Sequence, residues 1–339
     1  MTERTHPDDT TTPADTNRTT RTALVTGATS GLGFEAAAQL PDAGFDRVIV
    51  TGRSRDRALM AAEQLVERTG RPVFEPLALD LNAPTSVQQA ADELVERGVM
   101  IDYLLLNAGM VSGNDQVITD AGVEVTFSSS LIGHHQLTMR LLADERLSPT
   151  ARIVISGSEA ARDDVPTFSV VDVHELARKE YGGDATAASV ALILGEQPAK
   201  FKPGDVYATT KMFVAWWAAA LARRLPAGIT VNAISPGSAP DTNAIRNANF
   251  FMRKIMVPAF KHAPKRMGMA APVPVAATRY LQPLEWGPDV NGRFFASAPK
   301  KMTGPIEVMQ QPHVLDTDAQ EAGWAATVHV AGADVPAAV

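Results

Sequence analysis

The stretch TALVTGATSGLGFEAAAQL, residues 22–40, joins a short apolar run, a glycine-rich turn and an alanine-rich segment. The apolar run predicts a strand and the alanine-rich segment a helix, with Gly27, Gly31 and Gly33 in the turn between them. Glycine lets a backbone turn tightly and approach a pyrophosphate closely, and a helix N-terminus offers free N–H groups. This strand–turn–helix unit predicts a dinucleotide-binding site.

The same alternation continues along the chain. Apolar runs predict strands at 46–52, 72–80, 101–109, 151–157 and 228–237, and apolar periodicity predicts helices at 54–70, 84–98 and about 120–147. Short strands that alternate with helices are typical of βαβ units. The chain is therefore expected to form an α/β fold with a doubly wound parallel sheet.

Three segments do not follow this alternation of strands and helices. Residues 1–20 are polar and threonine-rich, which predicts a disordered tail. Residues 162–203 and 238–272 are insertions that begin just after the carboxyl ends of predicted strands. Ligands bind beyond these ends in open α/β sheets, so both insertions are candidates for the walls and lids of a substrate pocket.

Composition excludes several classes of function. The 339 residues carry a net charge of −7 and include no cysteine. An acidic chain argues against nucleic-acid binding, and the lack of cysteine excludes disulfides, thiolate nucleophiles and cysteine-bound metals. No apolar run reaches the length of a membrane span, and the N-terminus lacks a signal-peptide core. We expect a soluble, cytoplasmic protein without a transmembrane segment.

The end of the second predicted strand indicates which dinucleotide is bound. An NAD-binding unit usually has Asp or Glu there, whereas this chain has Gly52 and Arg53. A carboxylate that would repel a 2′-phosphate is missing, and a guanidinium that can bind one is present. The sequence favours NADP(H) over NAD(H), although Arg53 also fits an ordinary surface arginine.

The next two strand ends supply further candidate cofactor contacts. Asp80, followed by Leu81, fits either a hydrogen bond to an adenine amino group or a helix cap near Pro84. Asn107-Ala108-Gly109 places small residues where a cofactor would cross the fourth strand.

Six motifs occur in an order that resembles the short-chain dehydrogenase/reductase family: TGATSGLG, LALDL, LLLNAG, RIVISGSEA, YATTK and VNAISPG. The chain is similar to the branch of single-domain retinol dehydrogenases and protochlorophyllide reductases. The photochemical reductases of that branch rely on cysteines, which are missing here. The resemblance implies an NADP-dependent oxidoreductase and adds Ser30 and Leu32 to the expected cofactor contacts.

The resemblance also implies the boundaries of the fold. Residues 291–302 resemble a last strand, and residues 316–332 resemble a closing helix. We therefore expect a Rossmann-type sheet of about seven strands in one catalytic domain over 21–315, followed by a C-terminal helix and tail over 316–339.

The expected chemistry centres on VYATTKM, residues 206–212. The family's tyrosine, matched by Tyr207, gives a proton to a carbonyl oxygen while a hydride reaches the carbon. A free phenol titrates near 10, and the ammonium of Lys211, one helical turn further on, is expected to lower that pKa. The family's serine, which binds the substrate oxygen, aligns with Ser158, with Ser156 as the fallback.

One position departs from the family pattern. In SSSLIGHHQ, residues 128–136, Ser130 stands where the family has an asparagine that helps to hold a water for proton relay. A serine hydroxyl can bind water but has fewer hydrogen-bonding groups. The neighbouring His134 and His135 are interpreted as packing or surface residues, and no metal site is predicted.

The last motif and the segment after it concern the nicotinamide and the substrate. Pro236 and Gly237 are expected beside the nicotinamide, and Thr242 contacts its carboxamide or the pyrophosphate if the family spacing, one residue shorter, carries over. Residues 247–269 combine apolar and basic side chains. They fit either a pocket for a bulky lipophilic substrate, a surface for an anionic or membrane partner, or an amphipathic lid with a solvated basic face.

The predicted function is reduction of a carbonyl, or oxidation of the matching alcohol, on a bulky and lipophilic small molecule. The alternative is an NADP-binding sensor or scaffold with little turnover, which the change at Ser130 would suit. A nucleotide-sugar epimerase is disfavoured because a large C-terminal substrate domain is missing. Trp216 and Trp217 follow Tyr207 on one helix, and they fit either a homodimer contact or core packing.

Overall fold

The structure is a computed structural model that describes residues 20–166, 168–196, 200–239 and 270–336. Within these residues, eight strands form one sheet in the order β3-β2-β1-β4-β5-β6-β7-β8. The strands are β1 Thr22–Val25, β2 Arg47–Gly52, β3 Phe74–Ala78, β4 Ile101–Leu106, β5 Leu147–Ser156, β6 Thr230–Ile234, β7 Phe294–Ser297 and β8 Ile306–Val308. The first seven run parallel, so the predicted doubly wound sheet is confirmed.

The eighth strand was not predicted. Strand β8 is only three residues long and pairs antiparallel with β7 at the edge of the sheet, with Phe295 opposite Val308. A run of three residues, Ile-Glu-Val, is too short to give a recognisable apolar pattern.

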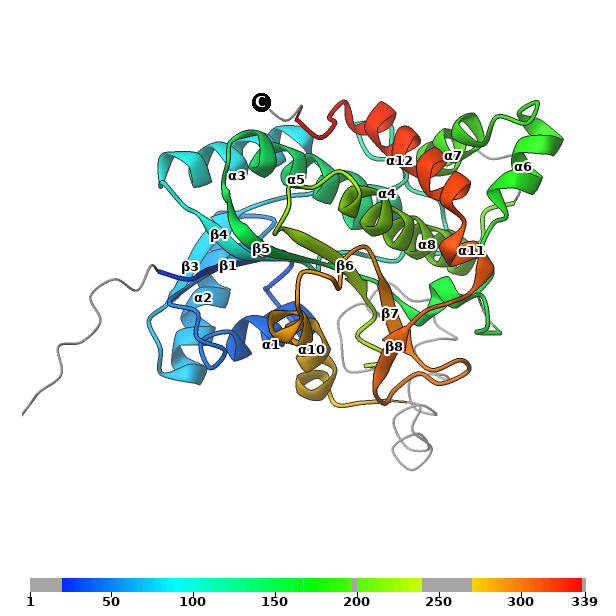
Figure 1. Cartoon of the computed structure of the whole chain (residues 1–339). Helices are drawn as coiled ribbons and strands as arrows, with labels where there is room; N and C mark the ends of the chain where they lie inside the picture. Colours follow the sequence, from blue (N-terminus) through cyan, green and yellow to red (C-terminus); the bar gives the residue numbers. More distant parts are fainter. Residues whose placement is uncertain (1–19, 167, 197–199, 240–269, 337–339) are drawn as a thin grey trace, which may run out of the picture.

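Two helical layers cover the sheet (Figure 1). One face carries α1 Gly31–Gln39, α2 Arg55–Thr69 and α10 Val273–Leu281, followed by η6 Gln282–Glu285; the other carries α3 Pro84–Glu96, α5 Gly133–Ala143 and α8 Pro203–Ala222. Each layer of helices packs against one face of the sheet and forms a separate hydrophobic core with it. Nearly continuous apolar strands such as IDYLLL in β4 follow from this double cover, because both faces are buried.

The helix expected over about 120–147 is shorter and broken. It consists of α4 Val125–Phe127, a π-helical turn η1 Ser128–Ile132, and α5. Glu124 sets its start, since the carboxylate Oε2 accepts hydrogen bonds from the amides of Thr126 at 2.8 Å and Phe127 at 3.1 Å. Residues 147–150 belong instead to β5, which begins four residues earlier than predicted.

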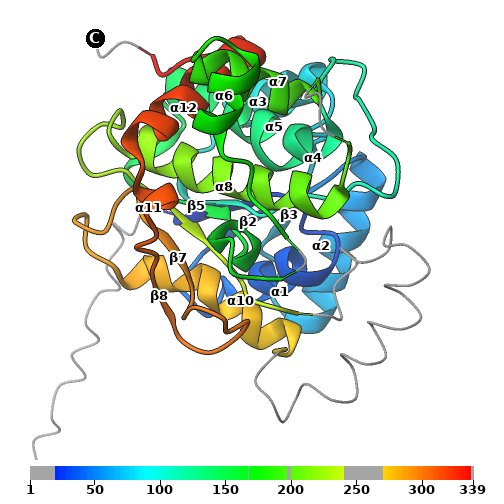
Figure 2. The same ribbon diagram turned by 90° about the vertical axis from the view of Figure 1, so that its right-hand side faces the viewer.

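The insertion at 162–203 is largely helical in its described part. It follows the 3₁₀ turn η2 Glu159–Arg162 and contains α6 Val173–Glu180 and α7 Ala185–Leu194. Helix α7 packs against the C-terminal α12 Thr317–Ala331, on the outer side of α8 (Figure 2). This position differs from the expected wall of the pocket, although the Phe168 ring lies 6.0 Å from the Tyr207 ring.

The expected closing helix is present as α12, which follows the short α11 Pro312–Leu315. Trp216 and Trp217 lie beneath this C-terminal region and are 3% and 1% exposed. The indole of Trp216 donates to the His313 carbonyl at 2.8 Å, and that of Trp217 donates to His135 Nδ1 at 3.0 Å. Core packing within the chain therefore accounts for both residues, and the homodimer stays a prediction.

Two predictions lie outside the described residues: the disordered tail over 1–20, except for its last residue, and most of the insertion at 238–272. Among the helices that the structure does describe, none is long and apolar enough to span a bilayer.

Candidate functional site

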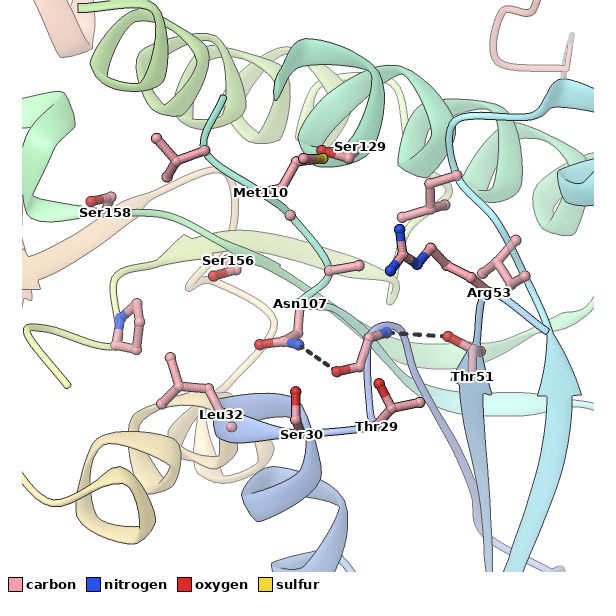
Figure 3. A pocket seen from close by; sticks show the side chains of 18 of the residues that line it. Thr29, Ser30, Leu32, Thr51, Arg53, Asn107, Met110, Ser129, Ser156 and Ser158 are labelled. Carbon is pink, nitrogen blue, oxygen red and sulfur yellow. Dashed lines mark hydrogen bonds between the residues drawn. The ribbon is translucent and has the colours of Figure 1, made fainter. Parts of the chain in front are cut away.

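A pocket of about 460 Å³ lies beyond the carboxyl ends of the parallel strands. Figure 3 shows Arg53 at one end of it and Ser158 at the other, with Asn107 between them. Most of the predicted site residues line this pocket: Gly27, Ser30, Gly31, Leu32, Arg53, Asp80, Leu81, Asn107, Ala108, Gly109, Ser158, Tyr207, Lys211, Pro236 and Gly237. The structure thus brings together residues that are far apart in the sequence.

The glycine-rich turn is held in place from two sides. Gly27 and Gly31 adopt φ values of 65° and 59°, which disfavour residues with a Cβ atom. The Gly27 amide donates to Thr51 Oγ1 at 3.2 Å, and the Asn107 side chain donates to the carbonyls of Thr26 and Gly27 at 3.0 and 3.4 Å (Figure 3). Asn107 therefore braces the turn as well as lining the pocket.

Gly33 has a packing role. It is buried in α1, and a Cβ atom there would lie 2.4 Å from Asn107 Nδ2 and 2.5 Å from the Gly27 carbonyl oxygen. The glycine lets α1 approach the turn closely, so that Ser30 and Leu32 reach the pocket. The side chain of Ser30, the N-cap residue of α1, forms no capping hydrogen bond, which leaves N–H groups of the first turn facing the pocket.

The Arg53 end of the pocket is basic. Arg53 and Arg57 both line it and are exposed, and within the described part of the chain neither guanidinium has a hydrogen-bond or ion-pair partner. Asp80 is the acidic residue in the lining, and it does not cap α3, whose N-cap is Ala83. One of its carboxylate oxygens accepts from the Asn82 amide at 3.0 Å.

The opposite end holds Tyr207 and Lys211. Both lie on the first turns of α8, and the Lys211 Nζ atom lies 5.8 Å from the centre of the Tyr207 ring. Lys211 donates to the Ser156 carbonyl oxygen at 2.7 Å. Ser158 follows β5 and begins η2, where its Oγ accepts from the Ala160 amide at 3.2 Å.

The expected effect of Lys211 on the phenol is not observed. Burial raises the pKa of Tyr207 above its ordinary value, and this outweighs hydrogen bonding to Ser158, which lowers it. Burial also lowers the pKa of Lys211 to about 8. Desolvation therefore dominates at this end of the pocket and favours the neutral form of both groups.

Ser130 lies behind the lining, in the π-helical turn. It is 1% exposed, and its hydroxyl has no hydrogen-bond partner among the described residues. A Cβ atom on Gly109 would come within 2.9 Å of Ser130 Oγ and 3.7 Å of Lys211 Nζ. Only glycine at this position lets the strand end pass so close to both groups.

His134 and His135 are fully buried rather than at the surface. His134 lies under the glycine turn, 2.9 Å from Thr26 Oγ1 and 3.2 Å from the Ser130 carbonyl oxygen. His135 contacts the Ala333 carbonyl oxygen at 2.7 Å and accepts from Trp217. Burial lowers their pKa values to about 3 and about 4, so both serve as neutral packing residues.

Several lining residues were not predicted, and Thr242 lies outside the described residues. The additional residues are Thr29, Thr51, Gly52, Arg57, Leu79, Asn82, Met110, Val111, Ser129, Gly157, Ser235 and Ala239, and Ser156 had been only the fallback for Ser158. Most of them adjoin a predicted residue in the sequence. They could have been found by extending each strand-end motif by one or two positions.

Comparison with known proteins gives a match to the short chain dehydrogenase family model over residues 21–170. A WW domain-containing oxidoreductase from Drosophila melanogaster is 31% identical over 68% of this chain, but the chain spans only about half, 52%, of that protein. Retinol dehydrogenase 13 from Homo sapiens is 25% identical over 93% of this chain and 86% of its own. A protochlorophyllide reductase from Avena sativa is 28% identical over 71% of this chain and 79% of its own.

Solved structures share the fold. An L-sorbose reductase from Gluconobacter frateurii, complexed with NADPH and L-sorbose, has a TM-score of 0.60 at 19% identity, over 86% of this chain and 100% of its own. An actinorhodin polyketide ketoreductase with NADPH has a TM-score of 0.59 at 22% identity, over 83% of this chain and 96% of its own.

Proposed function

The chain belongs to the short-chain dehydrogenase family, and we propose that it is an NADP(H)-dependent oxidoreductase that reduces a carbonyl group or oxidises the matching alcohol. One observation carries this proposal. One pocket has Tyr207 and Lys211 at one end and, at the other, Arg53 and Arg57, two arginines without a partner in the described part of the chain. A proton donor and a phosphate-binding group therefore face the same elongated site.

The residues of the pocket fit a dinucleotide. The tight turn at Gly27 and the uncapped start of α1 offer backbone N–H groups to a pyrophosphate. Gly109 lines the pocket at the end of β4, close to Lys211, and Asn107 braces the turn through its hydrogen bond to the Thr26 carbonyl oxygen. Arg53 would hold a 2′-phosphate. When bound, the reduced nicotinamide supplies a hydride.

The chain's own residues would supply the proton. Because burial raises the pKa of Tyr207, its phenol is protonated at neutral pH and suited to donate a proton to a carbonyl oxygen. The Ser158 oxygen accepts from Ala160, and its O–H group, which bonds the Tyr207 phenol in this structure, would turn to donate to the same carbonyl oxygen. Lys211 uses one N–H for Ser156 and has two left for ribose hydroxyls and the phenol oxygen.

Ser130 would take part in resupplying the proton. Its hydroxyl, which has no partner among the described residues, would lie 2.9 Å from a Cβ atom on Gly109, and Lys211 Nζ would lie 3.7 Å from the same atom. A water molecule held there could connect the lysine to solvent. The arrangement favours an enzyme over a sensor that only binds the cofactor, since a proton donor, a serine hydroxyl and a lysine line the same end of the pocket.

Replacing Arg53 with alanine tests the cofactor preference. Losing a charge-assisted contact to the 2′-phosphate should raise the KM for NADPH about 10- to 100-fold and leave the KM for NADH within about twofold. Steady-state kinetics with both cofactors measures this. Arg55→Ala is the matched control, because Arg55 pairs with Glu93 on the surface and should leave both values unchanged. Equal effects on NADPH and NADH would contradict the role of Arg53.

The substrate is expected to be a bulky, lipophilic ketone, aldehyde or quinone-like molecule. Met110 and Val111 line the described part of the pocket, and Phe168 packs beside Tyr207. These side chains provide an apolar surface next to the proton donor. The apolar and basic segment at 247–269 lies outside the described residues.

A substrate panel tests the proposed function directly. Purified protein is incubated with NADPH and a series of carbonyl compounds, from small polar to large apolar ones, and loss of the reduced-nicotinamide absorbance is followed. We expect kcat/KM to rise with apolar size, because each buried CH₂ group contributes about 0.8 kcal/mol. Turnover of small polar carbonyls only would refute the substrate class. NADPH binding without turnover on the whole panel would favour the sensor.

A further inference from the structure

A buried ion pair, Glu159 with Arg279, lies directly behind the catalytic end of the pocket. Glu159 follows Ser158 in the chain and is 2% exposed, and Arg279 on α10 is 6% exposed. Glu159 Oε1 lies 3.3 Å from Arg279 Nη1. Neither charge takes part in the reaction proposed above, so the pair needs another explanation.

The carboxylate joins the ends of three neighbouring strands. Glu159 itself follows β5, and its Oε2 accepts a hydrogen bond from the hydroxyl of Ser235, just after β6. Its Oε1 accepts from Ser297, the last residue of β7, through the hydroxyl at 3.0 Å and the amide at 3.3 Å. One side chain therefore fixes how the ends of β5, β6 and β7 lie relative to one another.

The guanidinium of Arg279, on α10, joins the hydrogen-bonded group formed by Glu159, Ser235 and Ser297. Its Nη1 donates to the Ser235 carbonyl oxygen at 3.1 Å, and its Nη2 donates to Ser297 Oγ at 2.9 Å and the Gly304 carbonyl oxygen at 2.6 Å. A Cβ atom on Gly237 would lie only 2.7 Å from Nη1. The guanidinium thus packs against the turn that Gly237 forms.

Ser235 transmits these contacts to the pocket lining. Its Oγ donates to Glu159 and accepts from the Gly237 amide at 3.2 Å, so the carboxylate sets the orientation of the hydroxyl. Gly237 has a φ of 81°, which glycine adopts readily, so the backbone alone does not restrict the turn and these contacts fix its position. Ser158, Ser235 and Gly237 all line the pocket. The ion pair therefore supports two of its walls at once.

Stability alone does not account for this arrangement. A buried ion pair is often no more stabilising than apolar residues of the same volume, because both charges lose their hydration. Preorganising reacting groups, in contrast, needs directional contacts of the kind seen here. We propose that Glu159 and Arg279 are positioning residues. They would hold Ser158 and the turn at 235–237 in the positions that the reaction requires. This inference rests on the proposed function of the pocket.

Glu159 also influences Tyr207 through its charge. The polar and charged groups around this phenol come from three places: Lys211 on α8, Ser158 and Glu159 at the end of β5, and Tyr280 on α10, whose own pKa Arg279 lowers. Glu159 raises the pKa of Tyr207, because its negative charge opposes formation of the phenolate. Removing that charge should lower the pKa of Tyr207.

Glu159→Gln tests the positioning role without any ligand. The amide keeps one acceptor oxygen but offers N–H groups toward Ser235, so the hydroxyl can no longer donate to residue 159 and loses the orientation that supports its bond with the Gly237 amide. Hydrogen–deuterium exchange should become faster at the amides of Ser235, Gly237 and Ser238 and stay unchanged in β1 and β2. Exchange that is unaltered at 235–238, or faster throughout the sheet, would overturn the proposal.

The same variant should be impaired in turnover. We expect kcat/KM to fall about 10- to 100-fold, and the limb of the pH–rate profile that belongs to Tyr207 to move to lower pH. Glu321→Gln is the matched control, because Glu321 pairs with Arg223 and Arg224 at the far end of α8 and should change neither quantity. Wild-type kcat/KM in Glu159→Gln, or an unmoved limb, would contradict the role.

Ser235→Ala is a second test of the same positioning role, which can be used if Glu159→Gln does not fold. It removes the link to the Gly237 amide but leaves the ion pair and the contacts with Ser297 in place. It should produce the same local rise in exchange at 237–238 and a weaker affinity for NADPH, measured by fluorescence. If the wild type binds NADPH but reduces no carbonyl, the proposed function is wrong. Hydrogen–deuterium exchange and NADPH affinity of the variants would still test whether Glu159 and Arg279 hold the turn in place.

Discussion

A Tyr207→Phe variant is expected to bind NADPH with wild-type affinity and to turn over carbonyl substrates at least ~10³-fold more slowly. The substitution removes one oxygen atom and leaves the ring, which packs near Phe168, in place. The proton for the carbonyl oxygen would then have to come from water. Burial keeps the pKa of Tyr207 above its ordinary value, so at neutral pH the substitution removes a proton donor rather than a base.

Two measurements separate chemistry from binding in this variant. Fluorescence titration gives the Kd for NADPH, and single-turnover kinetics gives the rate of reduction. Tyr181→Phe is the matched control, since Tyr181 ends α6 and does not line the pocket. Activity within about tenfold of the wild type would show that another group donates the proton.

A Lys211→Met variant should lose most turnover and at the same time become more stable. Lys211 is 4% exposed, and burial lowers its pKa to about 8 from 10.5. This corresponds to a cost of ~3 kcal/mol for holding the charged amine in the folded chain. Methionine has a similar length and no charge to bury, but the Ser156 carbonyl oxygen loses its donor. We expect a net gain of about 1–3 kcal/mol at pH 7.

The gain should depend on pH in a defined direction. Below about pH 8, both folded and unfolded wild-type chains carry the lysine proton, so the full cost of burial is present. Between about pH 8 and 10.5, the folded chain releases a proton that the unfolded chain keeps, and wild-type stability rises relative to the variant. The advantage of Lys211→Met is therefore largest at neutral pH and shrinks as the solution becomes alkaline.

Urea denaturation of both proteins at neutral and alkaline pH measures this difference. Lys179→Met is the control, because Lys179 is an exposed residue that pairs with Glu175 on α6 and bears no burial cost. A Lys211→Met variant less stable than the wild type at neutral pH would show that the amine stabilises the folded chain. Undiminished turnover would remove Lys211 from the proposed mechanism.

Much of the fold could be predicted from local sequence patterns. The glycines at 27 and 31 are required by backbone geometry, and the apolar strands are long enough to show burial on both faces. The three-residue β8 and the break at Ser128–Ile132 gave no such signal. The first depends on pairing with β7, and the second interrupts a pattern that looks like one continuous helix.

The pocket was predictable in its residues but less so in its electrostatics. Tyr207, Lys211 and Ser158 lie together, as their order in the motifs suggested. The spacing on one helix predicted that Tyr207 and Lys211 lie close together, but it could not predict that the phenol is buried. Burial raises the pKa of Tyr207, whereas a lower pKa was expected. The pairing of Glu159 with Arg279 links positions 120 residues apart, so it could be seen only in the folded chain.

The place of α12 has a consequence for how the protein is made. The helix at Thr317–Ala331 follows every other described element in the chain, yet its Trp324 and Ala326 complete the core over α5 and α8. Until this segment leaves the ribosome, the apolar side chains of α8 that it covers remain open to solvent or to chaperones. Contacts between distant parts of a chain also slow folding. The helical layer that carries Tyr207 and Lys211 can therefore reach its final packing only after α12 has also been synthesised.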